Sequence, residues 1–186
     1  MFLRKIFTRY WFLLLVSGTI IILDQISKAY IRANFLENVD MWAPWSWLLP
    51  YARIVHVSNT GVAFGLFQGQ GMIFAILAVI VSAAIIYYFP QVPSNDLTLR
   101  LAMGLQLGGA VGNLIDRLVQ GYVTDFISVG TFPVFNIADS SITIGVFVLI
   151  LGVWIQEQRE KKRQSLLQPP HPGLEPSSPD GNAGEL

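Results

Sequence analysis

The sequence predicts an α-helical membrane protein with four transmembrane helices and a small antiparallel β cradle on the outer face. The chain is 53% hydrophobic and only 13% charged over 186 residues, which is too apolar for an ordinary soluble domain. Several uncharged stretches approach the roughly 20 apolar residues that a membrane helix needs. Strand-like alternation of side chains is found in one loop, between the first two of these stretches.

Four segments supply the expected spans, namely 11–23, 72–89, 101–115 and 140–156. The second stops at Pro90, because proline cannot continue the helical hydrogen-bond ladder. The first reaches Asp24 early, but its helical pattern continues to about Arg32. No small-residue cleavage site follows it, so it is interpreted as a retained helix and not as a removed signal peptide.

The distribution of Lys and Arg predicts that both chain ends lie in the cytoplasm. With an even number of spans, both termini share one side of the membrane. That side carries eight basic residues, Arg4, Lys5, Arg9, Arg100, Arg159, Lys161, Lys162 and Arg163. The other side carries four, Lys28, Arg32, Arg53 and Arg117. An excess of Lys and Arg marks the cytoplasmic side.

The outer loop, 34–71, is long enough to hold the small sheet. The stretch from Arg53 to Ser58 alternates like a strand, Asn59-Thr-Gly is typical of a turn, and 62–67 would form the returning strand. The alternative is an irregular interfacial loop of Trp and Phe. Residues 164–186 are rich in Pro, Gly and Ser and are expected to form a disordered cytoplasmic tail, which leaves 1–163 as the membrane domain.

The residue types present exclude much catalytic chemistry. The chain has no Cys, so it has no disulfide, thiol nucleophile or thiolate metal site. Its two His are His56 and His171, and His171 lies in the Pro-rich tail, which disfavours a Ser-His triad or a His-based metal site. No metal, cofactor or nucleic-acid partner is expected. Catalysis by this chain would therefore depend mainly on carboxylates.

Three carboxylates, Asp116, Asp125 and Asp139, lie at the edges of long apolar segments. Ionisable groups there usually face a protein interior or cavity and mark function. Asp125 and Asp139 flank one short connection, so they can meet. Two close carboxylates share a proton, and such a pair can activate a water and protonate a leaving amine. The alternative for Asp139 is helix capping, with Asn136 as the N-cap.

Other polar residues gather near this pair. Asn113, Asp116 and Arg117 share one face at the end of the third span, where Asp116 is expected to form an ion pair with Lys28 or Arg117. Asp24 and Lys28, four residues apart, are expected to be a structural or supporting pair.

Asn59 lies in a turn and is explained either by turn chemistry or by hydrogen bonding to a substrate. Gly104, Gly108 and Gly112 recur every four residues of the third span. They predict close packing of this helix against another one.

Five motifs in this chain resemble those of the lipoprotein signal peptidases, or signal peptidase II. They are Asp24-Gln-Ile-Ser-Lys28, Asn59-Thr-Gly-Val-Ala-Phe64, Gly108-Gly-Ala-Val-Gly-Asn-Leu-Ile-Asp-Arg117, Val123-Thr-Asp-Phe-Ile127 and Phe135-Asn-Ile-Ala-Asp-Ser140. They cover the chain from the first helix into the fourth, whereas the tail after about Arg163 lies outside the resemblance.

The resemblance implies a four-helix aspartic endopeptidase of the bacterial inner membrane, with its active site at the outer face. It would remove the signal peptide of a prolipoprotein just before the diacylglyceryl-modified Cys. The implied catalytic pair is Asp125 and Asp139. The implied substrate-binding or supporting residues are Asn59, Asn113, Arg117 and Asn136. Diacylglyceryl-modified prolipoproteins and membrane lipids are the expected partners, and the chain is expected to be monomeric.

Two other function classes fit the apolar composition. A small proton-coupled transporter would also use intramembrane Asp residues, but the charges here gather at the outer edge of the spans and no internal repeat is evident. A structural subunit of a membrane assembly would use only the glycine face of the third span.

Overall fold

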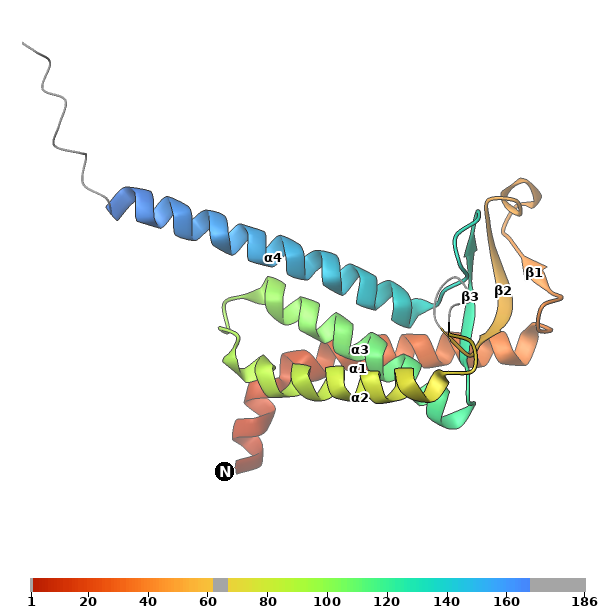
Figure 1. Cartoon of the computed structure of the whole chain (residues 1–186), viewed down its shortest axis with the longest axis horizontal. Helices are drawn as coiled ribbons and strands as arrows, with labels where there is room; N and C mark the ends of the chain where they lie inside the picture. The colour runs from red at the N-terminus through yellow and green to blue at the C-terminus, as the bar shows by residue number, and fades with distance from the viewer. Residues whose placement is uncertain (1, 62–66, 168–186) are drawn as a thin grey trace, which may run out of the picture. The chain divides into compact units, whose positions relative to one another are not determined.

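The computed structural model describes residues 2–61 and 67–167, with side chains from residue 9 to residue 166 outside the gap. Its long helices are α1 (Phe2–Asn34), α2 (Gly71–Tyr88), α3 (Leu97–Val119) and α4 (Ile137–Leu167). Its strands are β1 (Met41–Trp42), β2 (Ala52–Asn59) and β3 (Val123–Val129), and its short 3-10 helices are η1 (Ser46–Leu48) and η3 (Phe89–Gln91) (Figure 1). Residues up to Val153 form one compact unit, which holds all the strands.

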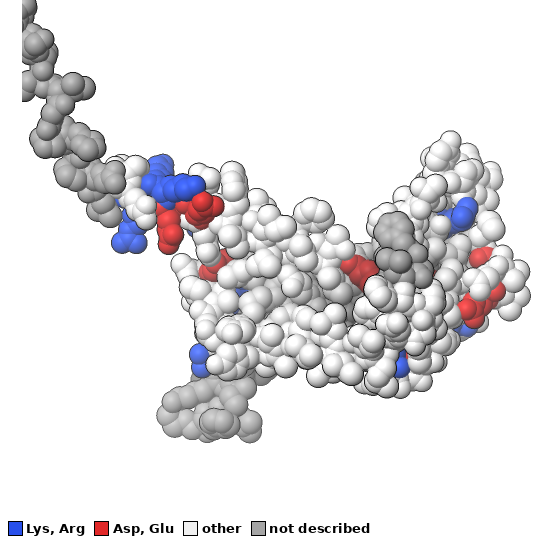
Figure 2. All heavy atoms as spheres, viewed as in Figure 1, with Lys and Arg blue, Asp and Glu red and all other residues white. Residues whose placement is uncertain are grey.

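Three of the four predicted spans are long and apolar enough to cross a membrane: Arg9–Asn34, Gly71–Gln91 and Ile137–Leu166. Large apolar side chains on these helices, such as those of Leu14 and Ile76, are more than half exposed. Figure 2 shows a surface that is mostly uncharged. Such a surface suits contact with lipid. Helix α3 is long enough but not apolar enough to be counted with these three, because it carries buried polar groups such as Asn113 and Asp116.

The predicted glycine face of α3 packs against α1. Each glycine faces one α1 residue so closely that an added Cβ atom would lie within 3.0 Å of it. The pairs are Gly104 with Val16, Gly108 with Ile20 and Gly112 with Asp24. Both helices advance by four residues from one pair to the next, so they run parallel. The prediction that small residues allow close helix packing is confirmed.

Helix α4 packs on another side of α3 and runs antiparallel to it. An added Cβ atom on Gly109 would collide with the Ala138 carbonyl oxygen, whereas Gly145 faces Gln106 and Gly152 faces Thr98. Moving forward along α4 therefore means moving backward along α3. The pocket described below lies where α3 ends and α4 begins.

The sheet is antiparallel, as predicted, with strand order β1-β2-β3. Its third strand is not the one expected from the loop sequence, because β2 pairs with β3, which follows α3. The register sets Val57 opposite Asp125. Of the expected returning strand, residues 62–66 lie outside the described residues, and Phe67 lies in a turn. Pairing between distant segments thus brings Asp125 into the sheet.

Helix α4 begins with the cap that the sequence predicts. The Asp139 N–H donates to Asn136 Oδ1 at 2.9 Å, and the Asn136 N–H donates to Asp139 Oδ2 at 3.3 Å. This exchange has the form of a capping box. At its other end the helix continues to Leu167, past the expected boundary at Arg163, and 168–186 lie outside the described residues.

Replacing Gly109 by Ala should separate α3 from α4, since its methyl group would meet the backbone of Ala138. We expect a loss of about 1–3 kcal/mol in unfolding free energy, as for overpacking elsewhere. Gly18→Ala is the matched control, because nothing lies within 4 Å of its added Cβ. Thermal unfolding in detergent measures the stability of both variants. Equal stability of the two variants would contradict the close packing.

Candidate active site

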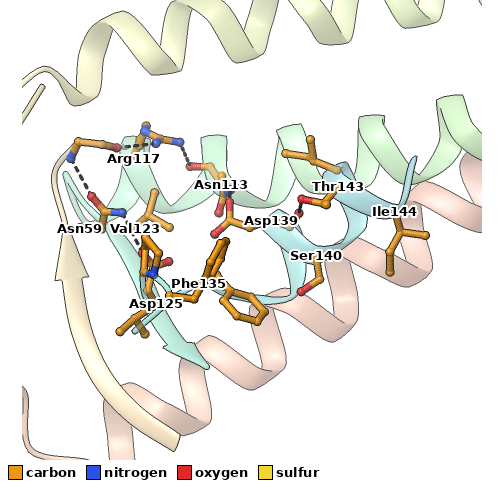
Figure 3. A pocket seen from close by; sticks show the side chains of 15 residues that line it. Asn59, Asn113, Arg117, Val123, Asp125, Phe135, Asp139, Ser140, Thr143 and Ile144 are labelled. Carbon is orange, nitrogen blue, oxygen red and sulfur yellow. Dashed lines mark hydrogen bonds between the residues drawn. The ribbon is translucent and has the colours of Figure 1, made fainter. Parts of the chain in front are cut away.

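A pocket of about 460 Å³ opens where β2, β3, α3 and the start of α4 meet (Figure 3). Five of the predicted site residues line it, namely Asn59, Asn113, Arg117, Asp125 and Asp139, and the start of α4 adds the hydroxyl groups of Ser140 and Thr143. The sixth, Asn136, is fully buried and hydrogen-bonded to the pair. Apolar walls come from the connection between β3 and α4, which supplies Phe132, Pro133, Val134 and Phe135. The structure thus brings together every residue predicted to line the site.

Asp125 projects from β3 and is held at both carboxylate oxygens. Asn59 Nδ2 donates to Oδ2 at 2.8 Å, and Asn136 Nδ2 donates to Oδ1 at 2.7 Å. Asn59 Oδ1 in turn accepts the Gly61 N–H at 2.9 Å. The two interpretations of Asn59 are therefore compatible, because one end of its amide forms the turn while the other holds Asp125.

The chain returns along β3 before α4 begins, and this return sets Asn136 beside Asp125. The Ile127 N–H donates to the Phe135 carbonyl at 2.8 Å, and the Phe135 N–H donates to the Ile127 carbonyl at 3.0 Å. Asn136 directly follows this bridge and caps α4. One residue therefore contacts both carboxylates of the pair, through its side chain and its backbone.

Asp139 is held by Asn113 of α3, whose Nδ2 donates to Asp139 Oδ1 at 2.7 Å. The opposite end of the Asn113 amide, Oδ1, accepts from Lys28 Nζ at 2.9 Å and from Asn136 Nδ2 at 3.2 Å. A lysine ammonium only donates hydrogen bonds, so the Asn113 oxygen must face Lys28. The Asn113 nitrogen is thereby turned toward Asp139.

Lys28 is fully buried and has one acceptor for each of its three N–H groups. Besides Asn113, its Nζ lies 2.8 Å from Asp24 Oδ2 and 3.3 Å from Asp116 Oδ2. The predicted Asp24–Lys28 and Asp116–Lys28 pairs are both present. Because a buried charge needs partners to offset its desolvation, these groups form a single unit.

This unit joins α1 to three other elements. Asp24 Oδ1 accepts the Ala138 N–H of α4 at 2.9 Å, and Asp116 Oδ2 accepts the Thr124 N–H of β3 at 3.0 Å. Asp116 itself belongs to α3. The two carboxylates therefore hold the backbone segments next to Asp125 and Asp139.

Arg117 does not form the alternative ion pair with Asp116. Its guanidinium donates to the carbonyl oxygens of Gly61 and Asn113, both at 3.4 Å. Its Cζ atom lies 5.7 Å from the centre of the Phe74 ring. Both hydrogen bonds are long, and the guanidinium has five N–H groups. Within the described part of the chain, it therefore keeps donors for a molecule in the pocket.

Burial, together with a smaller contribution from the nearby charge of Asp139, raises the pKa of Asp125 to about 7. The hydrogen bonds from Asn59 and Asn136 and the charge of Lys28 oppose this rise of the pKa, but burial outweighs them. Asp125 therefore remains partly protonated near neutral pH, where an exposed Asp has lost its proton.

Three supporting residues were not singled out from the sequence. Gln25 Nε2 donates to Asp24 Oδ2 at 3.1 Å, and Arg32 Nη1 donates to Thr124 Oγ1 at 3.0 Å. Gln25, Lys28 and Arg32 recur every three or four residues, so a helical face was visible in the sequence. Thr124 and the Phe132–Phe135 wall carry no comparable signal.

The signal peptidase II family model matches residues 16–155 of this chain. A lipoprotein signal peptidase of Shouchella clausii is 48% identical over 80% of this chain and 96% of its own length. One of Moorella thermoacetica is 40% identical over 73% of this chain and 88% of its own length. A solved bacterial membrane enzyme is similar with a TM-score of 0.69 and 31% identity, covering 88% of this chain and 94% of that one.

Replacing Lys28 by Met should leave the buried carboxylates Asp24 and Asp116 without their shared cation. We expect a loss of about 3–5 kcal/mol in unfolding free energy, as for other broken buried ion pairs. Lys161→Met is the matched control, because it breaks an exposed pair with Glu157 and should change stability little. Chemical unfolding in detergent compares them. A Lys28→Met chain as stable as the control would contradict the role of the buried unit.

Proposed function

The chain belongs to the signal peptidase II family and removes signal peptides from prolipoproteins, and we propose that it does so as an aspartic endopeptidase. The proposed catalytic pair is Asp125 and Asp139. The observation that carries the proposal is that both carboxylates line one pocket and contact the same Asn136, while the pKa of Asp125 is raised to about 7. The transporter interpretation is not supported, since the family consists of peptidases.

In the proposed reaction the pair holds one proton, carried by Asp125. Asp139 takes a proton from a water whose oxygen attacks the carbonyl carbon of the scissile peptide bond. The carbon–nitrogen bond then breaks as Asp125 gives its proton to the leaving amine. Asp139 now holds the proton taken from water, so the pair again holds one proton. A shift of this proton back to Asp125 restores the starting state.

The neighbouring polar groups have distinct proposed roles. Arg117 is proposed to bind the substrate, because most of its donors have no partner among the described residues. Asn59, Asn113 and Asn136 are proposed to orient the two carboxylates through the hydrogen bonds described above. Asp24, Lys28 and Asp116 are proposed to support these groups from beneath the pocket.

We also propose that α3 is the fourth membrane span. Its 23 residues extend about 35 Å at 1.5 Å per residue, enough for a hydrocarbon core of about 30 Å. Its charged or polar residues Arg100, Asn113 and Asp116 are buried, so its low hydropathy does not oppose this placement. With four spans, the Lys and Arg bias puts both termini in the cytoplasm and the pocket at the outer face.

The proposed substrate is a prolipoprotein that carries a diacylglyceryl-modified Cys after the scissile bond. A pocket at the membrane edge lets the lipid chains of the substrate remain in the bilayer during cleavage. The chain is proposed to act as a monomer surrounded by membrane lipids. Residues 1–163 are proposed to form the peptidase domain, and 164–186 a cytoplasmic tail outside it.

Asp125→Asn and Asp139→Asn should each lower cleavage by about 100- to 10,000-fold, because an amide cannot exchange the shared proton. The double variant should lose little more, since the two residues act as a unit. Asp40→Asn, a matched change outside the pocket, should keep full activity. Cleavage of a lipidated prolipoprotein is measured together with thermal unfolding in detergent. Near-normal turnover by either well-folded single variant would rule out the carboxylate pair.

The raised pKa of Asp125 predicts two effects of pH. Cleavage should fall as pH rises through about 7, because the pair then loses its shared proton. Between pH 3.8 and about 7 the folded chain keeps a proton that the unfolded chain has lost, so stability should also fall as pH rises through this window.

Asp125→Asn should flatten the stability change over that window, whereas Asp40→Asn should retain it. Unfolding midpoints measured in detergent across the same pH range separate the two variants. If stability instead rises with pH over the window in a way that Asp125→Asn abolishes, the pKa of Asp125 is lowered and not raised.

A further inference from the structure

A second pocket, of about 500 Å³, lies at the end of the helices opposite the candidate active site. It is formed by residues 9–12 of α1, by η3 and the residues that follow it, and by the first turn of α3. Arg100 lines this pocket and Arg117 lines the other one. Both are on α3, about 25 Å apart at 1.5 Å per residue. With α3 as the proposed fourth span, the two pockets lie near opposite faces of the membrane.

Two arginines line the second pocket, Arg9 and Arg100, and no acidic residue lines it. Arg100 is only 9% exposed, and its Cζ atom lies 4.4 Å from the centre of the Phe89 ring. Among the described residues, neither arginine forms an ion pair. The nearby Asp96 accepts the Leu99 N–H at 3.0 Å as the N-cap of α3. The pocket therefore concentrates positive charge beside aromatic and aliphatic groups.

Among the residues that the structure describes, these arginines use little of their hydrogen-bonding capacity. Arg9 Nη2 donates to the Pro90 carbonyl and Arg100 Nη1 to the Val92 carbonyl, each at a long 3.4 Å. Every guanidinium has five N–H groups in a planar fork that matches two phosphate oxygens. The Phe89 ring offsets part of the desolvation cost of the nearly buried Arg100 guanidinium, which has no anionic partner among the described residues. A bound phosphate group would supply that partner.

The surroundings of the arginines match the headgroup region of a bilayer. Trp11 lines the pocket and is 49% exposed, and Leu97 lines it and is 61% exposed. Trp is enriched where membrane meets water, and basic pockets between membrane helices bind anionic headgroups. We propose that this pocket binds the phosphodiester of an anionic phospholipid, with its acyl chains beside Trp11 and Leu97. This binding is independent of the proposed catalytic pair.

The test is retention of lipid by the purified full-length chain in mixed micelles of phosphatidylglycerol and phosphatidylcholine, measured by native mass spectrometry. The unmodified chain should retain phosphatidylglycerol preferentially. Arg9→Gln should lower this preference about fivefold, since one interfacial basic residue contributes about 1 kcal/mol. Arg100→Lys, which keeps the charge but loses the fork, should also lower it. Lys162→Gln is the charge-matched control outside the pocket, and Asp125→Asn should retain lipid normally.

Arg9 is exposed, so its replacement tests the site even if Arg100→Lys fails to fold. Equal retention of both lipids by the unmodified chain would overturn the proposal, and so would an Arg9→Gln chain that matches Lys162→Gln. Inorganic phosphate is added in a separate arm, against sodium chloride of equal ionic strength. Phosphate that displaces phosphatidylglycerol more than the chloride does would identify a general anion site and overturn the assignment to lipid. Equal displacement by phosphate and by chloride would support the assignment to lipid.

Discussion

The structure depends on the burial of one ammonium group, that of Lys28. A cation withdrawn from water must find an acceptor for every N–H, and the three acceptors here are Asp24, Asn113 and Asp116. The two carboxylates then use their remaining capacity on backbone N–H groups of α4 and β3. Satisfying a single charge therefore fixes the relative positions of α1, α3, β3 and the start of α4.

The orientation of the site follows from this buried charge through two amides. Because Lys28 can only donate, Asn113 turns its oxygen toward Lys28 and its nitrogen toward Asp139. Asn136 contributes its own nitrogen to Asp125 while its oxygen caps α4. Each amide has one donor end and one acceptor end, so neither can reverse without losing partners at both ends. The two carboxylates are thus oriented by groups that lie outside the proposed chemistry.

Local patterns in the sequence were sufficient for much of the architecture. Apolar length predicted three spans that the hydropathy of the helices supports, and the four-residue glycine repeat predicted the contact that α3 makes with α1. The spacing of Asp24 and Lys28 predicted their ion pair, and Asn136 was predicted as the cap of α4. These features were predictable because they depend on neighbours within one or two helical turns, or on composition alone.

Other features depend on contacts between segments that are distant in the sequence. The partner of β2 is β3 and not the adjacent loop. This pairing could not be predicted locally, because the backbone groups at the edge of a strand can pair with any segment that packs beside it. Whether Asp116 would pair with Lys28 or Arg117 was equally open until the helices packed. The sequence by itself determined which residues are ionisable and where the chain is apolar. Only the tertiary structure decided which charges from distant segments meet and which carboxyl is buried, because desolvation and long-range pairing arise from the surrounding atoms and not from the residue itself.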